Sequence, residues 1–267
     1  MAKLKDDPIT AKDLEEFVSS DSDFAFEMRV LAQLRGLGFE CEHSGTYRDP
    51  VTDKIRQFDI RGVKHQGNFT LALAVECKNL RPGYPLLLSA VPRTTPESFH
   101  DLIVWEREKV FSQSVRPVTG DASAYRPGEM VAKKTDQVGR DTSGALVSND
   151  EATFERLNQA VNSCRDLVQE YLSRSSPPLV RAVVPLLVVP PGLLWQVDYS
   201  ADGNLVTDPR QVGHAGLFLN SAWTVDLGVG WTLSYRLSHI DLVTLDALPE
   251  TVATYFGARG FFAAVKE

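Results

Sequence analysis

The stretch Phe69-Thr-Leu-Ala-Leu-Ala-Val-Glu-Cys-Lys78 joins an apolar run to an acidic and a basic residue. A run of this kind without Gly or Pro predicts a buried β-strand. Because side chains alternate between the two faces of a strand, Glu76 and Lys78 share one face and Cys77 lies on the other, as a core residue. The sequence therefore predicts a carboxylate and an ammonium group side by side at the end of a buried strand.

A second carboxylate precedes this strand. Asp59 lies seventeen residues before Glu76, within a predicted strand over residues 56–63. The short polar loop over residues 64–68 joins the two strands closely enough for an antiparallel hairpin. If Asp59 faces the same side as Glu76, the two carboxylates and Lys78 form a compact cluster that can bind a divalent metal ion and orient a water. Such a cluster is suited to the hydrolysis of a phosphate ester.

Two amphipathic helices frame these strands in the sequence. The first is expected to begin at the cluster Ser20–Asp23, to continue through residue 34 on one apolar stripe, and to lead into a strand over residues 39–43. The second begins with the capping-box pattern Ser148-Asn-Asp-Glu151 and ends before Ser175. The expected order is therefore helix, three strands, helix.

The remaining elements are mainly strands. Arg181–Val189 is an apolar run expected to be buried on both faces, with a bulge or an edge position at Pro185. Residues 80–130 contain six prolines and are predicted to be an insertion with short elements. The other expected elements are a strand over 193–199, a pairing of 223–227 with 231–235, and a helix over 248–256.

This order, with Asp59 on the second strand and Glu-x-Lys on the third, resembles the PD-(D/E)xK nuclease superfamily. Phe58-Asp59 stands where that family has Pro-Asp, and Glu76-Cys77-Lys78 matches (D/E)-x-K. The pair Phe26-Glu27, followed by a Gly-aromatic step, is similar to the opening of Mrr-like members. The resemblance covers residues 24–80 and is supported by the later helix and strand.

The resemblance implies an α/β fold of the restriction-endonuclease-like type, with a central mixed sheet flanked by helices. The whole chain, residues 1–267, is then expected to form one nuclease-like domain. Residues 80–130 would be an insertion within it, and the C-terminal part would be rich in strands.

The roles of the family carry over where residues match. Asp59 and Glu76 would ligate Mg²⁺ or Mn²⁺, with the carbonyl of Cys77 as a further ligand. Lys78 would position or deprotonate the attacking water and offset charge in the transition state. Glu27 would reach the site from the first helix. The simpler reading of Glu27 is a charged residue on the polar face of a helix, and Glu-x-Lys alone also suits a solvated strand end.

Gln137 is a further catalytic candidate by resemblance to RecB-like members, which carry a glutamine after the lysine. The tyrosine that normally follows four residues later is Asp141 in this chain. The nearby basic residues Lys133, Lys134 and Arg140 are candidates for phosphate contacts, and an exposed basic turn explains them equally.

The overall composition limits the function classes. The chain has 267 residues, 43% of them apolar, and a formal net charge of −7, which argues against nucleic-acid binding by the overall field. Three cysteines without metal-ligand spacing favour reduced thiols in the cytoplasm. No segment indicates export or passage through a membrane, and the five scattered histidines predict no His-ligated metal site.

Together with these features, the resemblance implies a cytoplasmic endonuclease that depends on Mg²⁺ or Mn²⁺ and acts on DNA in preference to RNA, in restriction, defence or repair. Cutting both strands of a duplex is simplest for a homodimer with two-fold symmetry. One alternative is a catalytically inactive nuclease-fold module that binds nucleic acid or a protein partner. Another is an interaction protein that uses the Pro-rich middle and the aromatic C-terminal half.

Overall fold

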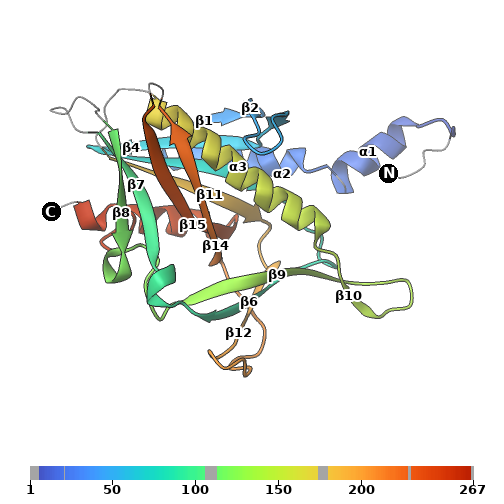
Figure 1. Cartoon of the computed structure of the whole chain (residues 1–267). Helices are drawn as coiled ribbons and strands as arrows, with labels where there is room; N and C mark the ends of the chain where they lie inside the picture. The colour runs from blue at the N-terminus through green and yellow to red at the C-terminus, as the bar shows by residue number, and fades with distance from the viewer. Residues whose placement is uncertain (1–5, 21, 106–112, 174–179, 228–229, 266–267) are drawn as a thin grey trace.

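The computed structural model describes residues 6–20, 22–105, 113–173, 180–227 and 230–265. Its main feature is a mixed sheet of thirteen strands with helices on both faces (Figure 1). The helices are α1 (Ala11–Ser20), α2 (Phe24–Gly36), α3 (Glu151–Ser173) and α4 (Leu248–Phe256). None of the helices in the described ranges is long and apolar enough to cross a membrane.

The strands of the first half are β1 (Glu40–His43), β2 (Thr46–Arg48), β3 (Ile55–Gln57), β4 (Ile60–Gln66), β5 (Phe69–Cys77), β6 (Leu86–Pro92), β7 (Phe99–Trp105) and β8 (Gln113–Thr119). Those of the second half are β9 (Met130–Arg140), β10 (Leu146–Ser148), β11 (Val180–Val189), β12 (Leu194–Asp198), β13 (Arg210–Gln211), β14 (His214–Asp226) and β15 (Thr232–Thr244). The short strands β2 and β3 pair with each other outside the main sheet.

The strands that follow α2 form the first part of the main sheet. β1, β4 and β5 are antiparallel neighbours, and β11 then lies parallel to β5 and to β15. The chain crosses from β5 to β11 through a long connection that includes α3, as a parallel pair requires. The expected order of helix, three strands, helix and strand therefore corresponds to α2, β1, β4, β5, α3 and β11, with further elements between them.

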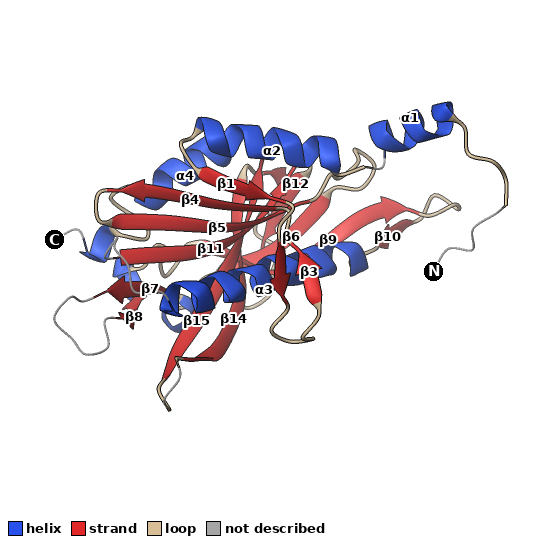
Figure 2. Cartoon of the chain, turned by 90° about the horizontal axis from the view of Figure 1, so that it is seen from above, coloured by secondary structure: helices blue, strands red, loops and turns tan. Residues whose placement is uncertain are grey.

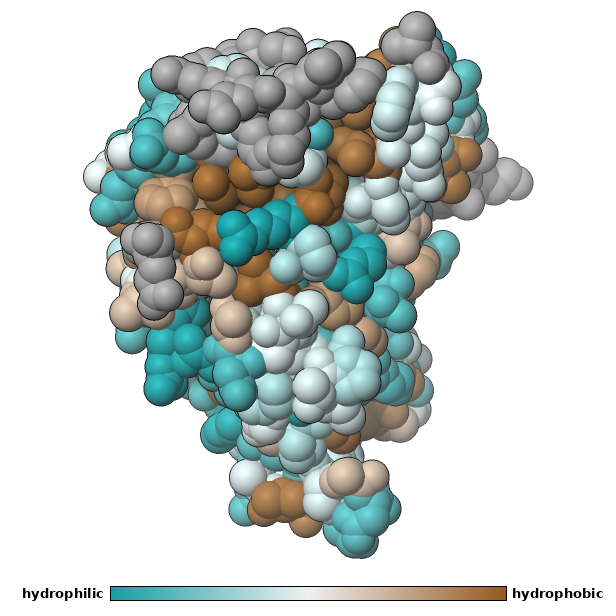
Figure 3. Space-filling view, turned by 60° about the vertical axis from the view of Figure 1, so that its left-hand side comes forward, coloured by the Kyte–Doolittle hydropathy of each residue, from teal (hydrophilic) through white to brown (hydrophobic). Residues whose placement is uncertain are grey.

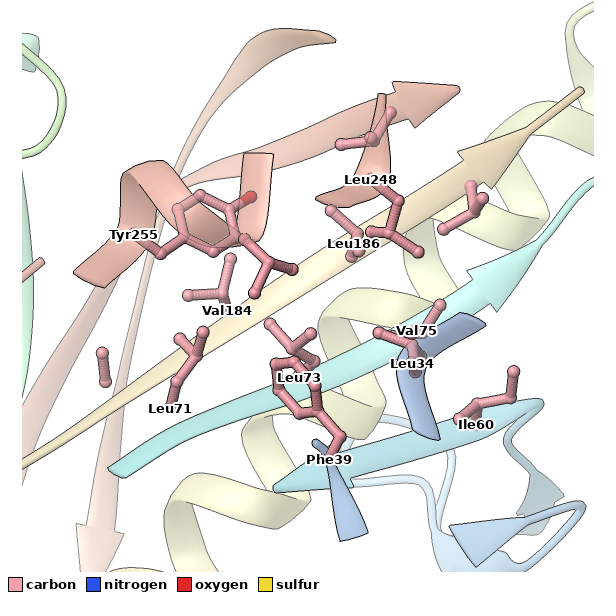
Figure 4. Close-up of a cluster of buried hydrophobic side chains, with 14 of the residues drawn as sticks. Leu34, Phe39, Ile60, Leu71, Leu73, Val75, Val184, Leu186, Leu248 and Tyr255 are labelled. Atoms are coloured by element: carbon pink, nitrogen blue, oxygen red, sulfur yellow. The ribbon is translucent and has the colours of Figure 1, made fainter. Parts of the chain in front are cut away.

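Two apolar layers hold the helices against this sheet. Figure 4 shows side chains of α2, β4, β5, β11 and α4 gathered on one face, among them Leu34, Leu73, Leu186 and Leu248. On the other face, α3 packs against the small side chains of β5 and against β11. Figure 2 shows α2 and α3 on opposite sides of these strands. Because both faces are covered, β5 is buried along nearly its whole length.

The second part of the sheet extends away from this core. β14 pairs with β15, and β9, β6, β12 and β13 follow in that order. In Figure 1 this part lies below the helices. Figure 3 shows the side that lies to the left in Figure 1, where hydrophilic and near-neutral groups cover most of the lower half and hydrophobic groups gather in the upper half.

Several predicted elements are confirmed. The strand over residues 69–77 and the helix over 248–256 have the expected bounds, and the paired strands 223–227 and 231–235 belong to the hairpin of β14 and β15. Residues 80–130, which are expected to be an insertion with short elements, contain β6, which pairs with β9 and β12, and the hairpin of β7 and β8. The assignment of this segment as an insertion stays a prediction.

Of the two expectations for Pro185, the bulge is wrong, whereas one side of this residue is unpaired, as at an edge position. Pro185 lies opposite Ala74 inside a strand that pairs with β5 along its whole length. On its other side, β11 pairs with β7 only at residues 180–181 and with β15 only from Leu186 onward. Pro185 therefore stands between two ladders, where its missing N–H interrupts neither.

The predicted strand over residues 56–63 is in fact two strands. β3 ends at Gln57 and β4 begins at Ile60. In between, the Phe58 N–H donates to the Gly45 carbonyl and the Asp59 carbonyl accepts from the Ser44 N–H. This break leaves Asp59 immediately before β4, at the mouth of the hairpin with β5.

Candidate functional site

Asp59 and Glu76 face each other across the hairpin. Ile60 pairs with Val75, and continuing this antiparallel register by one residue places Asp59 opposite Glu76. Glu76 belongs to the face of β5 that packs against α3, and its side chain is almost fully buried. Both sequence-predicted carboxylates therefore lie at the same end of neighbouring strands.

Arg156, on the first turns of α3, bridges these carboxylates. Its Nη1 lies 3.4 Å from Asp59 Oδ1 and 3.3 Å from Glu76 Oε2, and its Nη2 donates to Asp23 Oδ2 at 3.0 Å. Asp23 immediately precedes α2, and its Oδ1 accepts the N–H of Asn79. The Arg156 guanidinium thus joins the starts of α2 and α3 to the start of β4 and the end of β5.

The other oxygen of Glu76 has no such partner. Oε1 is buried and makes no hydrogen bond with any described residue. Burial, together with the nearby charge of Asp59, raises the pKa of Glu76 to about 9. Burial also raises the pKa of Asp59, although the Cys77 N–H and Arg156 oppose that shift. For Glu76, burial and the charge of Asp59 therefore outweigh the positive charge of Arg156, which disfavours ionisation of both carboxyl groups at neutral pH.

Cys77 supports the site through its backbone. Its N–H donates to Asp59 Oδ2 at 2.7 Å, which fixes the second carboxylate oxygen. Its thiol points into the apolar layer under α2, and burial raises the pKa of the thiol well above its ordinary value. Cys77 is therefore a core residue, as the sequence predicts, and its thiol is not a nucleophile.

Lys78 extends the strand at the same end. Its N–H donates to the Val188 carbonyl, so the pairing with β11 continues one residue beyond Cys77. By the alternation of side chains, Lys78 then faces the same side as Glu76. Its ammonium makes no ion pair or hydrogen bond with the described residues, and its side chain is half-buried.

Glu27 is held by a histidine that the sequence did not indicate. Glu27 Oε2 lies 3.1 Å from His43 Nε2, and the Phe24 ring packs 5.9 Å from the His43 ring. The negative charge of Glu27 also helps to raise the pKa of Asp59. The structure places Glu27 beside the site, with His43 as its direct partner.

Phe58, where the resembled family has proline, anchors Asp59 in the core. Its ring is fully buried, and the Arg61 guanidinium lies 4.3 Å from the ring centre. Gly45 allows this packing, because a Cβ there would lie 2.4 Å from both Phe58 Cζ and Glu42 Oε1. Arg61 in turn pairs with Asp166 on α3 at 2.8 Å.

Gln137 lies near the start of α3 and does not contact the carboxylates. Its side-chain oxygen accepts from Thr153 Oγ1 at 3.1 Å, and its N–H donates to Asp150 Oδ1. Asp150 also accepts from the Ser148 hydroxyl, and Ser148 itself belongs to β10. Instead of the predicted capping box of Ser148 and Glu151, the structure has a contact between Gln137 of β9 and Asp150, the residue before α3. This contact fixes the turn that precedes Arg156.

Two of the three basic residues near Gln137 already have acidic partners. Lys133 Nζ lies 2.5 Å from Glu97 Oε1, and Lys134 Nζ lies 2.5 Å from Asp136 Oδ1. Arg140 donates to the Gly144 carbonyl within its own turn. The pairing with Glu97 and Asp136 offsets the charge that Lys133 and Lys134 would offer to a phosphate.

Sequence reasoning missed Arg156, His43 and the bridging role of Asp23. Arg156 lies on the polar side of an amphipathic helix, where an arginine needs no special role. With Arg156 between the carboxylates, no group of three or more His, Cys, Asp and Glu side chains in the described part of the chain is arranged to hold a metal ion.

Comparisons with known proteins add no identification. The chain matches no family model, no curated protein and no solved structure.

Proposed function

We propose that this chain is a metal-dependent nuclease of the restriction-endonuclease-like fold, which hydrolyses phosphodiester bonds in DNA. The observation that carries the proposal is the meeting of Asp59 and Glu76 on one cationic group, Arg156, at the ends of two buried strands. The order of α2, β1, β4, β5, α3 and β11, with β5 parallel to β11, supports the fold.

The donor set suits a hard divalent cation. Asp59 and Glu76 offer carboxylate oxygens, and the buried Oε1 of Glu76 lacks any partner among the described residues. Mg²⁺ or Mn²⁺ would be held by these two side chains and by the Cys77 carbonyl, and would supply Lewis-acid stabilisation to a phosphate. In the protein alone, Arg156 contacts Asp59 Oδ1 and Glu76 Oε2, so its guanidinium would have to move aside.

The remaining residues have separate tasks in this proposal. Lys78, on the same face as Glu76, would orient a water and offset the negative charge that develops on the phosphate. Glu27 and His43 would hold a proton between them beside Asp59. The contact of Gln137 with Thr153 would set the position of α3 and thereby of Arg156.

The test is cleavage of supercoiled plasmid, single-stranded DNA and single-stranded RNA in Mg²⁺ or Mn²⁺. Wild type should cut DNA only with metal, and Asp59→Asn should not cut, although its amide oxygen can still accept the Cys77 N–H. Glu155→Gln, an exposed neighbour of Arg156, is the matched control and should retain activity. Cleavage by Asp59→Asn at the wild-type rate would refute the proposal.

A second function, binding without cleavage, is favoured by Arg156. A guanidinium between two carboxylates is also what a nuclease fold without turnover would carry. In that case wild type would bind DNA without cutting it, and added Mn²⁺ would not change its thermal stability.

A further inference from the structure

A pocket of about 390 Å³ lies on the opposite face of the sheet from the carboxylate pair. Glu76 pairs with Leu187 and Leu187 with Leu242, so these three side chains share one face. Asp241, the neighbour of Leu242, therefore faces the other side, where it lines the pocket. The pocket and the candidate catalytic site are separate.

The floor of the pocket contains a buried carboxylate with one oxygen that accepts no hydrogen bond from the described residues. Asp241 is fully buried, and its Oδ2 accepts from Tyr255 at 2.5 Å and from Tyr125 at 3.3 Å. Its Oδ1 makes no hydrogen bond with the described residues and lies 3.4 Å from His214 Nε2. Burial alone would raise the pKa of Asp241, but His214 and the Tyr255 hydroxyl outweigh it and hold that pKa below its ordinary value.

A buried arginine lies beside this oxygen. Arg93 Nε donates to His239 Nε2, and its Nη1 contacts the Arg126 carbonyl and Glu129. Its Nη2 has no hydrogen bond to a described residue. A Cβ at Gly216 would lie 3.6 Å from Nη2 and 3.4 Å from Asp241 Oδ1. Because Gly216 has no side chain, a donor on Arg93 and an acceptor on Asp241 both border the same open space.

Aromatic and basic side chains line the rest of the pocket. Three aromatic side chains line the pocket, those of Tyr125, Tyr255 and Phe261. Three more arginines line it as well: Arg126, Arg210 and Arg259. Arg210 pairs with Asp198 outside the pocket, whereas exposed Arg259 has no partner among the described residues.

We propose that this pocket binds a nucleotide, with the base at Arg93 and Asp241 and the phosphate at the arginine rim. A nucleobase edge offers an acceptor next to an N–H donor, which matches Arg93 Nη2 and Asp241 Oδ1. Guanidinium groups bind phosphate through paired N–H donors. The volume lies within the range of small-molecule sites. An anion alone would leave Asp241 Oδ1 unsatisfied.

The test is isothermal titration of the full chain with the four ribonucleoside 5′-monophosphates and with inorganic phosphate. At least one nucleotide should bind with a stoichiometry of one, and about tenfold more tightly than phosphate, because the base adds hydrogen bonds to charged groups. Gly216→Ala, which meets only ordinary contact distances, and Arg259→Ala should each weaken binding about tenfold. Arg116→Ala, an exposed arginine on β8, should not.

Asp59→Asn should leave nucleotide affinity unchanged, which separates this pocket from the proposed nuclease site. The proposal is overturned if none of the four nucleotides binds saturably, or if phosphate binds as tightly as the best nucleotide. Unchanged affinity in a folded Arg259→Ala variant, with circular dichroism like that of wild type, would overturn it as well.

Discussion

Arg156 Nη1 lies 3.3 Å from Glu76 Oε2, so a guanidinium stands where the proposed metal ion would be held. Glu76 is buried, whereas the Arg156 side chain retains 25% of its exposure. The Glu76 carboxylate is therefore fixed by the sheet, whereas the Arg156 guanidinium reaches it from the partly exposed start of α3. This asymmetry makes Arg156 the group that can leave when a metal ion binds.

Arg156→Met should therefore lower stability and tighten metal binding together. Methionine keeps the apolar stem but leaves the carboxylates without their cation, so the free energy of unfolding without metal should fall by about 2 kcal/mol. Mn²⁺ no longer competes with the guanidinium, and its Kd should fall about tenfold or more. Urea denaturation and isothermal titration measure the two effects.

Arg29→Met is the control for this change, because Arg29 lies on the exposed side of α2 over the Phe26 ring. It should alter neither the unfolding free energy nor the Mn²⁺ affinity appreciably. A Kd for Mn²⁺ that is unchanged or higher in Arg156→Met would contradict the competition between guanidinium and metal.

The raised pKa of Glu76 predicts a pH dependence with a definite sign. Because the folded pKa is about 9 and the unfolded value is near 4.5, the metal-free protein loses the contribution of Glu76 to stability as pH rises through this window. Metal binding requires the ionised form, so the Kd for Mn²⁺ should fall about tenfold per pH unit between pH 6 and pH 8. Isothermal titration with Mn²⁺ at several pH values measures how steeply the Kd depends on pH. The variant Glu76→Gln, which has no carboxyl group to titrate at this position, is the comparison. A Kd that is independent of pH would contradict the assignment.

Lys78→Met should separate chemistry from metal binding. By the alternation along the strand, the Lys78 side chain faces the same side as Glu76, and it makes no ion pair with the described residues, so its loss should leave Mn²⁺ affinity and thermal stability near those of wild type. Loss of its charge at the phosphate should lower the rate of DNA cleavage about 100-fold or more. Lys134→Met, which removes an exposed lysine paired with Asp136, should cut at the wild-type rate. Equal rates for the two variants would remove Lys78 from the mechanism.

Gly45→Ala tests the support beneath Asp59. The new Cβ would lie 2.4 Å from Phe58 Cζ, so the Phe58 ring must move, at a cost of about 1–3 kcal/mol in unfolding free energy. Because Phe58 adjoins Asp59, cleavage should fall as well. Gly36→Ala, where a Cβ meets nothing within 4 Å, is the matched control and should be neutral or stabilising in thermal denaturation. Equal stability of both variants would show that this packing is not required.

The sequence alone predicted correctly those helices and strands whose pattern of apolar residues matches their burial in the structure. Residues 69–77 are apolar on both sides because β5 is covered by helices on both faces, so the run alone predicts the strand. The approach of Asp59 to Glu76 followed from the hairpin. The break at Phe58 and Asp59 was not predictable, because it depends on hydrogen bonds to residues 44–45 in another strand connection.

Arg156 could not be assigned from the sequence for a related reason. It is separated from Glu76 by 80 residues and from Asp59 by 97, and nothing in its local pattern distinguishes it from a solvated arginine. Only the parallel pairing of β5 with β11 brings α3 over the end of the hairpin. The sequence likewise could not decide between a bulge and an unpaired side at Pro185, because that depends on where two neighbouring ladders end.

The most direct measurement is anomalous diffraction from crystals soaked in Mn²⁺. An anomalous peak is predicted about 2.1 Å from one oxygen of Asp59 and one of Glu76, with the Arg156 guanidinium displaced from both. No peak between the two carboxylates at saturating Mn²⁺, with Arg156 still in place, would contradict the proposal that they form a metal-dependent catalytic centre.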